Sequence, residues 1–234
     1  MTDRNQEDLR YMQMALDMAK LGRGYTNPNP MVGAVIVKDG QVIAKGYHHC
    51  CGQGHAEVEA FKDAGDQDVT GATIYVTLEP CSHYGKTPPC ADKIIEKKIG
   101  RVVVGALDPN PLVAGRGIEK IRNAGIEVTT GILAEESIKL NEIFMKYIVN
   151  KEPFVLYKSA MSLDGKIATA SGESQWISCE ESRKEVHELR HQYMAIMVGS
   201  QTVLDDDPML NCRLIEGKDP IRVVVDSSLR IPMT

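Results

Sequence analysis

The sequence predicts an α/β chain in two parts, with a three-layer domain around a mixed sheet over residues 1–149 and a second α/β pattern over residues 150–234. Short apolar, strand-like runs alternate with segments of helical periodicity on both sides of a boundary at 150–153. Hydrophobic residues make up 43% of the 234 residues and charged residues 25%. These values are typical of a globular protein with surface enough to bury a core.

The elements of the first domain follow from local patterns. Apolar residues at helical spacing from Leu9 to Ala19 predict the first helix. The prolines of Asn27-Pro28-Asn29-Pro30 exclude a helix there, because each pushes its predecessor towards extended geometry. Asp39-Gly40 is typical of a hairpin turn between strands. The expected elements are a helix around 9–19, strands at 32–37 and 42–44, a helix at 55–64, a strand at 73–78, a helix at 90–98, a strand at 101–106, a helix at 117–123, a strand at 126–129 and a helix at 135–147.

The second part begins a new alternation of strands and helices after residue 153. The apolar run at 154–159 predicts a strand, and the amphipathic pattern from 179 or 180 to 191 predicts a helix. Two further strands are expected at 194–199 and 220–226.

A group of potential metal ligands lies in the first domain. His55 is followed two residues later by Glu57, and Pro80-Cys81 is followed by Cys90. One imidazole and two thiolates leave the fourth corner of a zinc tetrahedron open, which is typical of a catalytic site. Bound water then ionises near neutral pH, and Glu57 is placed to shuttle protons. This combination is the pattern of zinc-dependent nucleobase deaminases.

The predicted elements favour convergence of these ligands. His55 and Cys90 fall at helix starts, where the positive end of the helix dipole stabilises a thiolate, and Cys81 follows a strand. The alternative is a histidine at a helix start and two cysteines buried as small hydrophobic residues. Pro-Cys after a strand, with a second cysteine close behind, favours zinc.

Composition excludes several other classes. A formal net charge of −5 argues against a nucleic-acid partner. No apolar run approaches the length of a membrane span, and residues 1–10 lack the apolar core of a signal peptide. The remaining cysteines are expected to be reduced thiols of a cytoplasmic protein: Cys50, Cys51, Cys179 and Cys212.

His187-Glu188-Leu189-Arg190-His191 fits the HExxH pattern of zinc proteases on a predicted helix. The alternative is a charged amphipathic helix. No persuasive third ligand follows, so we reject the protease interpretation.

Several motifs together resemble the bifunctional riboflavin-biosynthesis deaminase/reductase family, and the resemblance covers essentially the whole chain. Eight residues separate Cys81 from Cys90, whereas cytidine and tRNA-adenosine deaminases have two there. The motifs that carry the resemblance are Asn29-Pro30-Met31-Val32-Gly33, His55-Ala56-Glu57, Thr77-Leu78-Glu79-Pro80-Cys81-Ser82-His83, Pro89-Cys90, Asp108-Pro109-Asn110-Pro111, Val113-Ala114-Gly115-Arg116-Gly117, Ser162-Leu163-Asp164-Gly165-Lys166, Ser171-Gly172-Glu173-Ser174-Gln175-Trp176-Ile177 and Asp205-Asp206-Asp207-Pro208.

For the first domain the resemblance implies a cytidine-deaminase-like three-layer α/β/α fold and a pyrimidine deaminase with one Zn²⁺. The matching positions are His55, Cys81 and Cys90 as zinc ligands, Glu57 for proton transfer, and Asn29, His48 and Lys86 for substrate recognition. The implied substrate is a small-molecule nucleotide, 2,5-diamino-6-ribosylamino-4(3H)-pyrimidinone 5′-phosphate, which loses its 2-amino group as ammonia. Lys86 would pair with the phosphate.

For the second domain the resemblance implies the first part of a dihydrofolate-reductase-like domain that uses NADPH to reduce the ribosyl group to ribityl. The matching positions for NADPH are Ala160, Trp176, Thr202, Asp206 and Ser227, and those for substrate are Ser174, Arg190, Leu210 and Arg213. The Gly-rich segment that would hold the cofactor phosphates does not occur before Thr234. We therefore expect this chain to deaminate but not to reduce, with residues beyond about 151 partly folded or protected by assembly into a homo-oligomer.

Two other functions stay open at this point. The first is a deaminase of nucleic-acid bases or free nucleosides. A nucleic-acid substrate would require a basic groove, which the acidic net charge does not indicate. The second is a non-catalytic zinc module, which would need four ligands and no poised carboxylate such as Glu57.

Overall fold

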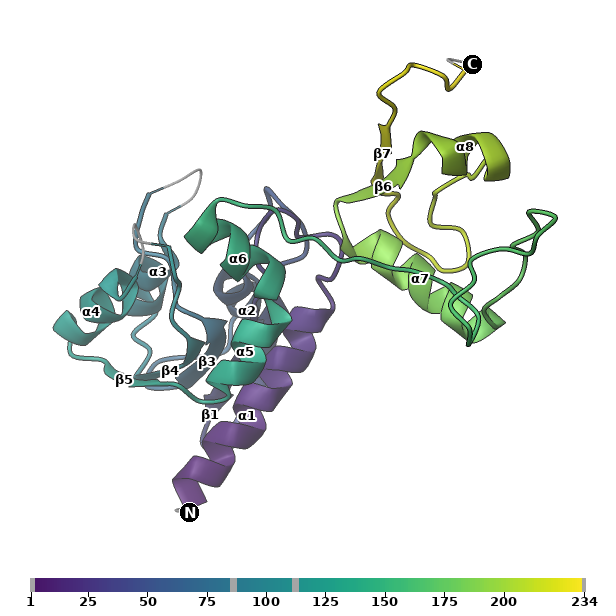
Figure 1. The fold of residues 1–234 in the computed structure, drawn as a ribbon. Coiled ribbons are helices and arrows are strands. Elements are labelled where there is room, and N and C mark those ends of the chain that lie inside the picture. Colours follow the sequence, from purple (N-terminus) through teal and green to yellow (C-terminus); the bar gives the residue numbers. More distant parts are fainter. Residues whose placement is uncertain (1–2, 85–87, 111–113, 233–234) are drawn as a thin grey trace. The chain divides into compact units, whose positions relative to one another are not determined.

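The computed structural model describes residues 3–84, 88–110 and 114–232. The chain forms two compact units, Met1–Phe154 and Val155–Thr234, and each is described by itself. The boundary predicted from the sequence lay between residues 149 and 150. Figure 1 shows the elements of both units. None of the helices in the described ranges combines the length and apolar character needed to cross a bilayer.

The first unit is built on a five-stranded sheet in the order β2-β1-β3-β4-β5. β1 pairs antiparallel with β2 and β3, whereas β3, β4 and β5 run parallel, so the predicted mixed sheet is confirmed. The strands are β1 (Gly33–Lys38), β2 (Gln41–Tyr47), β3 (Thr73–Leu78), β4 (Arg101–Ala106) and β5 (Glu127–Thr130).

Helices cover both faces of this sheet (Figure 1). On one face, α2 (Ala56–Ala64), α3 (Cys90–Glu96) and α4 (Arg116–Asn123) enclose a core that contains Ile74 and Val102. On the other face, α1 (Asp3–Lys20) packs on the alternate strand residues, and α5 (Ala134–Leu140) also contacts β4. Because successive strand residues point to opposite faces, the apolar runs of β1, β3 and β4 supply both layers. The three-layer arrangement is confirmed.

Gly46 of β2 allows α2 to approach the sheet closely. A Cβ atom added at Gly46 would overlap backbone atoms of Ala56 and Ala60. The helix therefore rests on the strand backbone itself. This contact fixes the height of α2, whose N-terminal end carries His55 and Glu57.

The helix expected at 135–147 is wrong in extent, because the structure has two helices there. α5 ends at Leu140 and α6 (Glu142–Asn150) begins after Asn141. The Asn141 side chain is buried and binds the backbone of Met31. A long-range contact, which helical periodicity does not reveal, accounts for the break.

The second unit has a parallel pair of strands, β6 (Ala195–Gly199) and β7 (Ile221–Val225), with α7 (Glu180–Gln192) before β6 and α8 (Ser200–Asp206) after it. α8 was not expected. The strand expected at 154–159 is wrong: the backbone there is irregular, and Tyr157 is 86% exposed. A strand forms by pairing, and within the described ranges the sheet of this unit contains β6 and β7 only.

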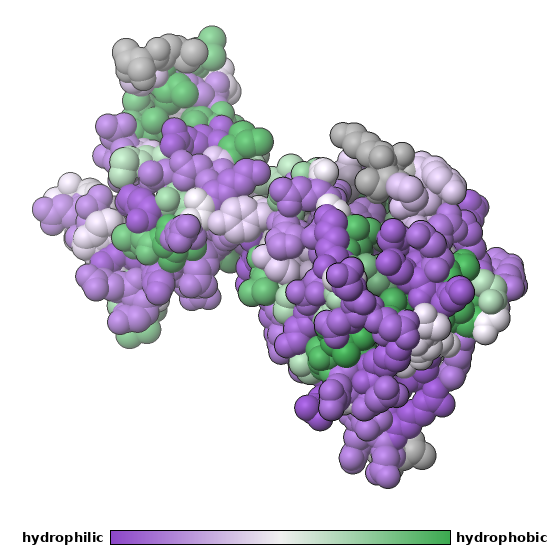
Figure 2. Space-filling view, turned by 180° about the vertical axis from the view of Figure 1, so that it is seen from behind, coloured by the Kyte–Doolittle hydropathy of each residue, from purple (hydrophilic) through white to green (hydrophobic). Residues whose placement is uncertain are grey.

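Large apolar side chains reach the surface of the second unit. They include Met197 of β6, and Ile221 and Val225 at the two ends of β7. In Figure 2, hydrophobic residues are visible on the surface of this unit. Its two strands are therefore less buried than those of the first unit.

Candidate metal centre and active site

The structure brings His55, Cys81 and Cys90 together, and one ligand atom from each lies within 4.8 Å of the others. The His55 Nδ1 atom is 3.5 Å from the Cys81 sulfur and 3.4 Å from the Cys90 sulfur. One nitrogen and two sulfurs at these separations fit three corners of a zinc tetrahedron. This donor set also suits zinc better than it suits magnesium or calcium, which prefer oxygen ligands.

Three different elements supply the ligands. His55 immediately precedes α2, Cys81 lies just beyond the carboxyl end of β3, and Cys90 is the first residue of α3. Two hydrogen bonds donated by backbone N–H groups join Cys81 to the start of α3. The Cys90 N–H donates to the Cys81 sulfur at 3.3 Å, and the Ala91 N–H donates to the Cys81 carbonyl at 3.1 Å. These helix starts and this strand end were predicted from the sequence.

Local electrostatics favour a thiolate at Cys81. Hydrogen bonding from Cys90 lowers the pKa of the Cys81 thiol, and His55 acts in the same direction against the effect of burial. The same contact with Cys81 raises the pKa of His55. A thiolate is the form that binds zinc, so the site is prepared for a cation.

Glu57 is 3% exposed in the first turn of α2. Burial, with the nearby Cys81 charge, raises the pKa of the Glu57 carboxyl to about 7. Hydrogen bonding with Cys81 and burial raise the pKa of the Cys90 thiol, and the nearby Glu57 charge acts in the same direction, which places Glu57 beside the ligands. A carboxyl that titrates near neutral pH can accept a proton in one step and return it in the next.

Asn29 and His48 lie together next to the ligand group. His48 Nδ1 donates to the Gly54 carbonyl at 2.9 Å, because a carbonyl oxygen can only accept. Burial lowers the pKa of His48, so the ring is neutral and its Nε2 atom accepts from the Asn29 amide at 3.1 Å. The His48 ring stands edge-on to His55, with 5.7 Å between ring centres. Lys86, the third expected recognition residue, lies outside the described residues.

Two buried polar residues near the site were not predicted as functional. Glu79, which is 4% exposed, accepts backbone hydrogen bonds from Gly115 at 2.9 Å and Gly117 at 3.0 Å. Asn141 binds both backbone polar groups of Met31, two residues beyond Asn29. The local sequence signal for Glu79 is an acidic residue that directly follows a predicted strand.

In the second unit, part of the expected substrate set is brought together. Arg190 on α7 donates to the Asn211 carbonyl at 3.0 Å, and its Nη1 atom is 3.1 Å from Nε2 of the buried His187. The Arg213 backbone N–H donates to His187 Nδ1 at 3.0 Å. Arg190 and Arg213 are close enough that repulsion from Arg213, after burial, lowers the pKa of Arg190. Leu210 is buried in the same loop.

The other expected residues of the second unit lie on separate segments. Trp176 is 64% exposed, and the Arg183 guanidinium lies over its ring at 4.5 Å. Thr202 and Asp206 are on α8, and Ser227 follows β7. Ala160 and Ser174 lie in irregular backbone.

The histidines of the HExxH pattern have other partners. His187 accepts from the Arg213 N–H, and His191 Nδ1 accepts from the Lys218 N–H at 2.9 Å. Both rings therefore tie α7 to the loop that follows α8. Among the described residues, the group of potential metal ligands is His55, Cys81 and Cys90, which supports rejection of the protease interpretation.

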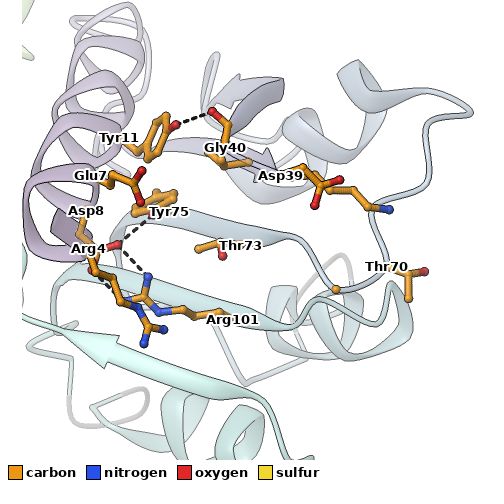
Figure 3. Close-up of a pocket in the computed structure, with 13 residues that line it drawn as sticks. Arg4, Glu7, Asp8, Tyr11, Asp39, Gly40, Thr70, Thr73, Tyr75 and Arg101 are labelled. Carbon is orange, nitrogen blue, oxygen red and sulfur yellow. Dashed lines mark hydrogen bonds and ion pairs between the residues drawn. The ribbon is translucent and has the colours of Figure 1, made fainter.

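A cavity of about 450 Å³ lies elsewhere in the first unit (Figure 3). Its lining includes Thr73 and Arg101, which start β3 and β4, whereas Cys81 lies beyond the opposite end of β3. Asp8 in this cavity accepts from Tyr75 at 2.9 Å and from both Arg101 terminal nitrogens at 2.7 Å. These contacts join α1 to the starts of β3 and β4, so the polar groups of this cavity have a structural role.

Comparison with protein families agrees with this geometry. Residues 5–106 match the cytidine and deoxycytidylate deaminase zinc-binding region, and residues 153–234 match the RibD C-terminal domain. The fold and the His-Cys-Cys group thus define a zinc-binding domain of the cytidine-deaminase class.

Comparisons over nearly the whole of this chain identify the family within this class. The chain is 56% identical to the riboflavin biosynthesis protein RibD of Actinobacillus pleuropneumoniae, over 97% of this chain and 60% of that protein. It is 51% identical to RibD of Aquifex aeolicus, over 97% of this chain and 64% of that protein. The chain belongs to the RibD family of riboflavin-biosynthesis deaminase/reductases, as the sequence motifs predicted.

Solved structures agree. The diaminohydroxyphosphoribosylaminopyrimidine deaminase/5-amino-6-(5-phosphoribosylamino)uracil reductase from Thermotoga maritima matches with a TM-score of 0.92 and 52% identity, over 95% of this chain and 64% of that one. RibD from Acinetobacter baumannii matches with a TM-score of 0.91 and 47% identity, over 98% of this chain and 66% of that one. The predicted fold class is confirmed, and the chain spans less than two thirds of each of these four relatives.

Proposed function

We propose that the first unit catalyses the hydrolytic, zinc-dependent deamination of 2,5-diamino-6-ribosylamino-4(3H)-pyrimidinone 5′-phosphate to 5-amino-6-ribosylaminouracil 5′-phosphate in riboflavin biosynthesis. The observation that carries this proposal is the convergence of His55, Cys81 and Cys90, with the buried Glu57 beside them. The activity named for the Thermotoga maritima relative supports the choice of substrate.

The residues divide the chemistry among them. A zinc ion held by His55, Cys81 and Cys90 would supply Lewis acidity and ease the ionisation of water. Glu57 accepts the proton of the attacking water and then delivers a proton to the departing 2-amino group. The C2–O bond forms first, and the C2–N bond then breaks, so that ammonia leaves. Asn29, fixed by the neutral His48, offers polar contacts to the ring.

For the second unit, we propose that it contributes part of an NADPH-dependent reductase site. The paired arginines Arg190 and Arg213 fit the phosphate of the deamination product, since guanidinium groups bind phosphate in a planar, bidentate way. Trp176, Thr202, Asp206, Ser227 and Ala160 are proposed for NADPH, and Ser174 and Leu210 for substrate. Cytoplasmic action and assembly into a homo-oligomer belong to the same proposal.

The test measures ammonia release from the diaminopyrimidinone nucleotide by the purified chain. We expect activity that a chelator removes and added zinc restores. Glu57→Gln should keep one zinc per chain and lower the rate roughly 10²–10⁴-fold, because positioned proton transfer supplies about that much. Glu96→Gln is the matched control, since its side chain is 68% exposed on α3.

Two outcomes would favour the alternatives. Zinc binding with no ammonia release would point to a non-catalytic zinc module. Full activity of Glu57→Gln would instead refute the proton-transfer role of Glu57. Faster release from single-stranded polynucleotides or free nucleosides than from the nucleotide would point to a base deaminase of another substrate class. NADPH oxidation, followed in the same samples with the deaminated product, reports on the second unit separately.

A further inference from the structure

The side-chain amide of Asn141 forms two hydrogen bonds with the backbone of Met31, a pair of contacts that we call the clamp. Its Oδ1 atom accepts from the Met31 N–H at 2.7 Å, and its Nδ2 atom donates to the Met31 carbonyl at 2.9 Å. The two bonds span 110 positions of sequence, and the side chain is 97% buried. An amide that satisfies both polar groups of one residue acts as a neighbouring strand would.

The clamp is anchored to the sheet through α5. Ser137, one turn before Asn141, is fully buried, and its hydroxyl donates to the Leu133 carbonyl at 2.9 Å. A Cβ atom added at Gly105 of β4 would overlap the Ser137 hydroxyl, so helix and strand are in close contact there. The Asn141 amide also reaches the Ser137 carbonyl at 3.4 Å. Its position is therefore set by β4.

The clamped segment carries Asn29. The Asn29 N–H closes a turn on the Thr26 carbonyl at 2.8 Å, and its side chain reaches His48. His48 is tied to the same segment by its backbone N–H, which donates to the Val32 carbonyl at 2.9 Å. Met31, which Asn141 binds, therefore lies in the chain between two contacts with His48. Asn29 makes one of them with its side chain, and Val32 makes the other with its backbone carbonyl.

We propose that Asn141 is a positioning residue for substrate recognition: by clamping Met31 it fixes the place of Asn29 beside His48. The inference rests on the proposed deaminase function for its effect on substrate, but the clamp itself is a structural claim. Asn141 lies on the face of the sheet covered by α5, and its bonds go to Met31 and Ser137. Its loss should therefore spare zinc binding.

The experiment compares three variants of the full chain with the unaltered protein. Asn141→Ala removes both bonds to Met31. Asn141→Asp keeps the acceptor for the Met31 N–H but loses the donor to the carbonyl. Asn150→Ala, an exposed position on α6, is the matched control. Zinc per chain, amide exchange of Met31 by NMR, and KM and kcat for ammonia release from the diaminopyrimidinone nucleotide are measured for each.

For Asn141→Ala we expect Met31 amide exchange to rise about tenfold or more, because a buried hydrogen bond is lost. KM should rise about tenfold with kcat within about threefold, as expected when uniform substrate binding is weakened. Zinc should stay at the unaltered level. Asn141→Asp should also raise Met31 exchange and KM, because a carboxylate oxygen would face the Met31 carbonyl in place of the amide donor. Asn150→Ala should match the unaltered chain.

Several outcomes would overturn the inference. Unchanged Met31 exchange in Asn141→Ala would remove the clamp, and faster exchange with unchanged KM would remove its link to recognition. If Asn141→Ala does not fold, Asn141→Asp decides by the same two readouts. An unaltered chain that releases no ammonia would refute the proposed deaminase and with it the recognition role, whereas the exchange readout tests the clamp alone.

Discussion

Glu79 is a buried carboxylate whose hydrogen-bond partners include backbone N–H groups of the segment after β4 and of the first turn of α4. Gly115 donates to one oxygen and Gly117 to the other, with longer bonds from Asp108 and Ile118 at 3.4 Å. A carboxylate has only acceptor oxygens, so it can face several N–H donors at once. Glu79 lies two residues before Cys81, so it joins the loop that carries this ligand to the start of α4.

Replacing Glu79 by Gln should therefore be costly despite the similar shape. The Gln amide nitrogen is a donor and would face backbone N–H groups, leaving them buried and unpaired. We expect the free energy of unfolding to fall by about 1–3 kcal/mol. Urea denaturation measures this. The exposed Glu119→Gln on α4 is the control, and equal stability of the two variants would refute this role for Glu79.

At this scale the sequence revealed residues that belong to short motifs with recognisable chemistry. His55, Glu57, Cys81 and Cys90 were predicted because they lie in short motifs typical of zinc sites and near predicted helix starts. Glu79 and Asn141 were missed, because their partners lie 38 and 110 positions away. A single polar residue next to an apolar run does not identify such a partner.

Asp8 links α1 to two strands of the sheet. It accepts two bonds from Arg101 at the start of β4 and one from Tyr75 of β3. Burial acts to raise the pKa of Asp8, but the bonds from Arg101 and Tyr75 prevail and lower it below the ordinary value of 3.8. A carboxylate with a depressed pKa stabilises the folded state above its unfolded-state pKa and loses that contribution as pH falls through the folded-state pKa.

Asp8→Asn should consequently destabilise the protein most at neutral pH. We expect a loss of roughly 3 kcal/mol near pH 7, because the buried Arg101 loses its buried carboxylate partner and keeps only the more exposed Glu127 as an ion pair. The difference from the unaltered chain should shrink below pH 3.8, as Asp8 itself becomes protonated. Denaturation at several pH values measures this. Asp17→Asn, on an exposed part of α1, should cost less than about 1 kcal/mol at any pH, and a pH-independent difference for Asp8→Asn would contradict the argument.

Gly46→Ala tests the contact of α2 with β2. The added methyl group would overlap the helix backbone at Ala56 and Ala60, so α2 must move outward. We expect roughly 2 kcal/mol of destabilisation from overpacking and weaker zinc binding, since His55 moves with the helix. Thermal unfolding and zinc titration measure both effects. Gly199→Ala, where an added Cβ would meet no atom within 4 Å and φ is −77°, should be tolerated.

Elements were predicted well where apolar runs are buried within the first unit, and β3 and β4 match their expected bounds. The sequence pattern failed to predict elements whose bounds or pairing depend on residues far away in the sequence. Asn141 divides one expected helix into α5 and α6, and residues 154–159 have strand-like composition but pair with no strand in the described part of the chain. The polar helix α8 has little apolar periodicity to reveal it.

The two units differ in how completely they bury their apolar residues. In the first unit, core clusters cover both faces of the sheet. In the second unit, β7 leaves Ile221 65% exposed and Val225 58% exposed. Burial of apolar area is the main source of folding free energy, so the first unit holds most of the stability of this chain.

Limited proteolysis tests this difference directly. Val155 is 77% exposed and Tyr157 86% exposed in irregular backbone, so chymotrypsin should cut first near residues 154–157 in the zinc-loaded chain. Proteases act on segments that open at little cost, whereas the ligand loops of the first unit would be held by the metal. The fragment ending near Phe154 should keep one zinc and its ammonia release, and the remainder should be degraded faster. Mass spectrometry identifies the cut, and metal analysis follows the fragment. Early cleavage within residues 33–106 would contradict the greater stability assigned to the first unit. Loss of zinc once the chain is cut near residue 154 would show that the metal centre depends on the second unit.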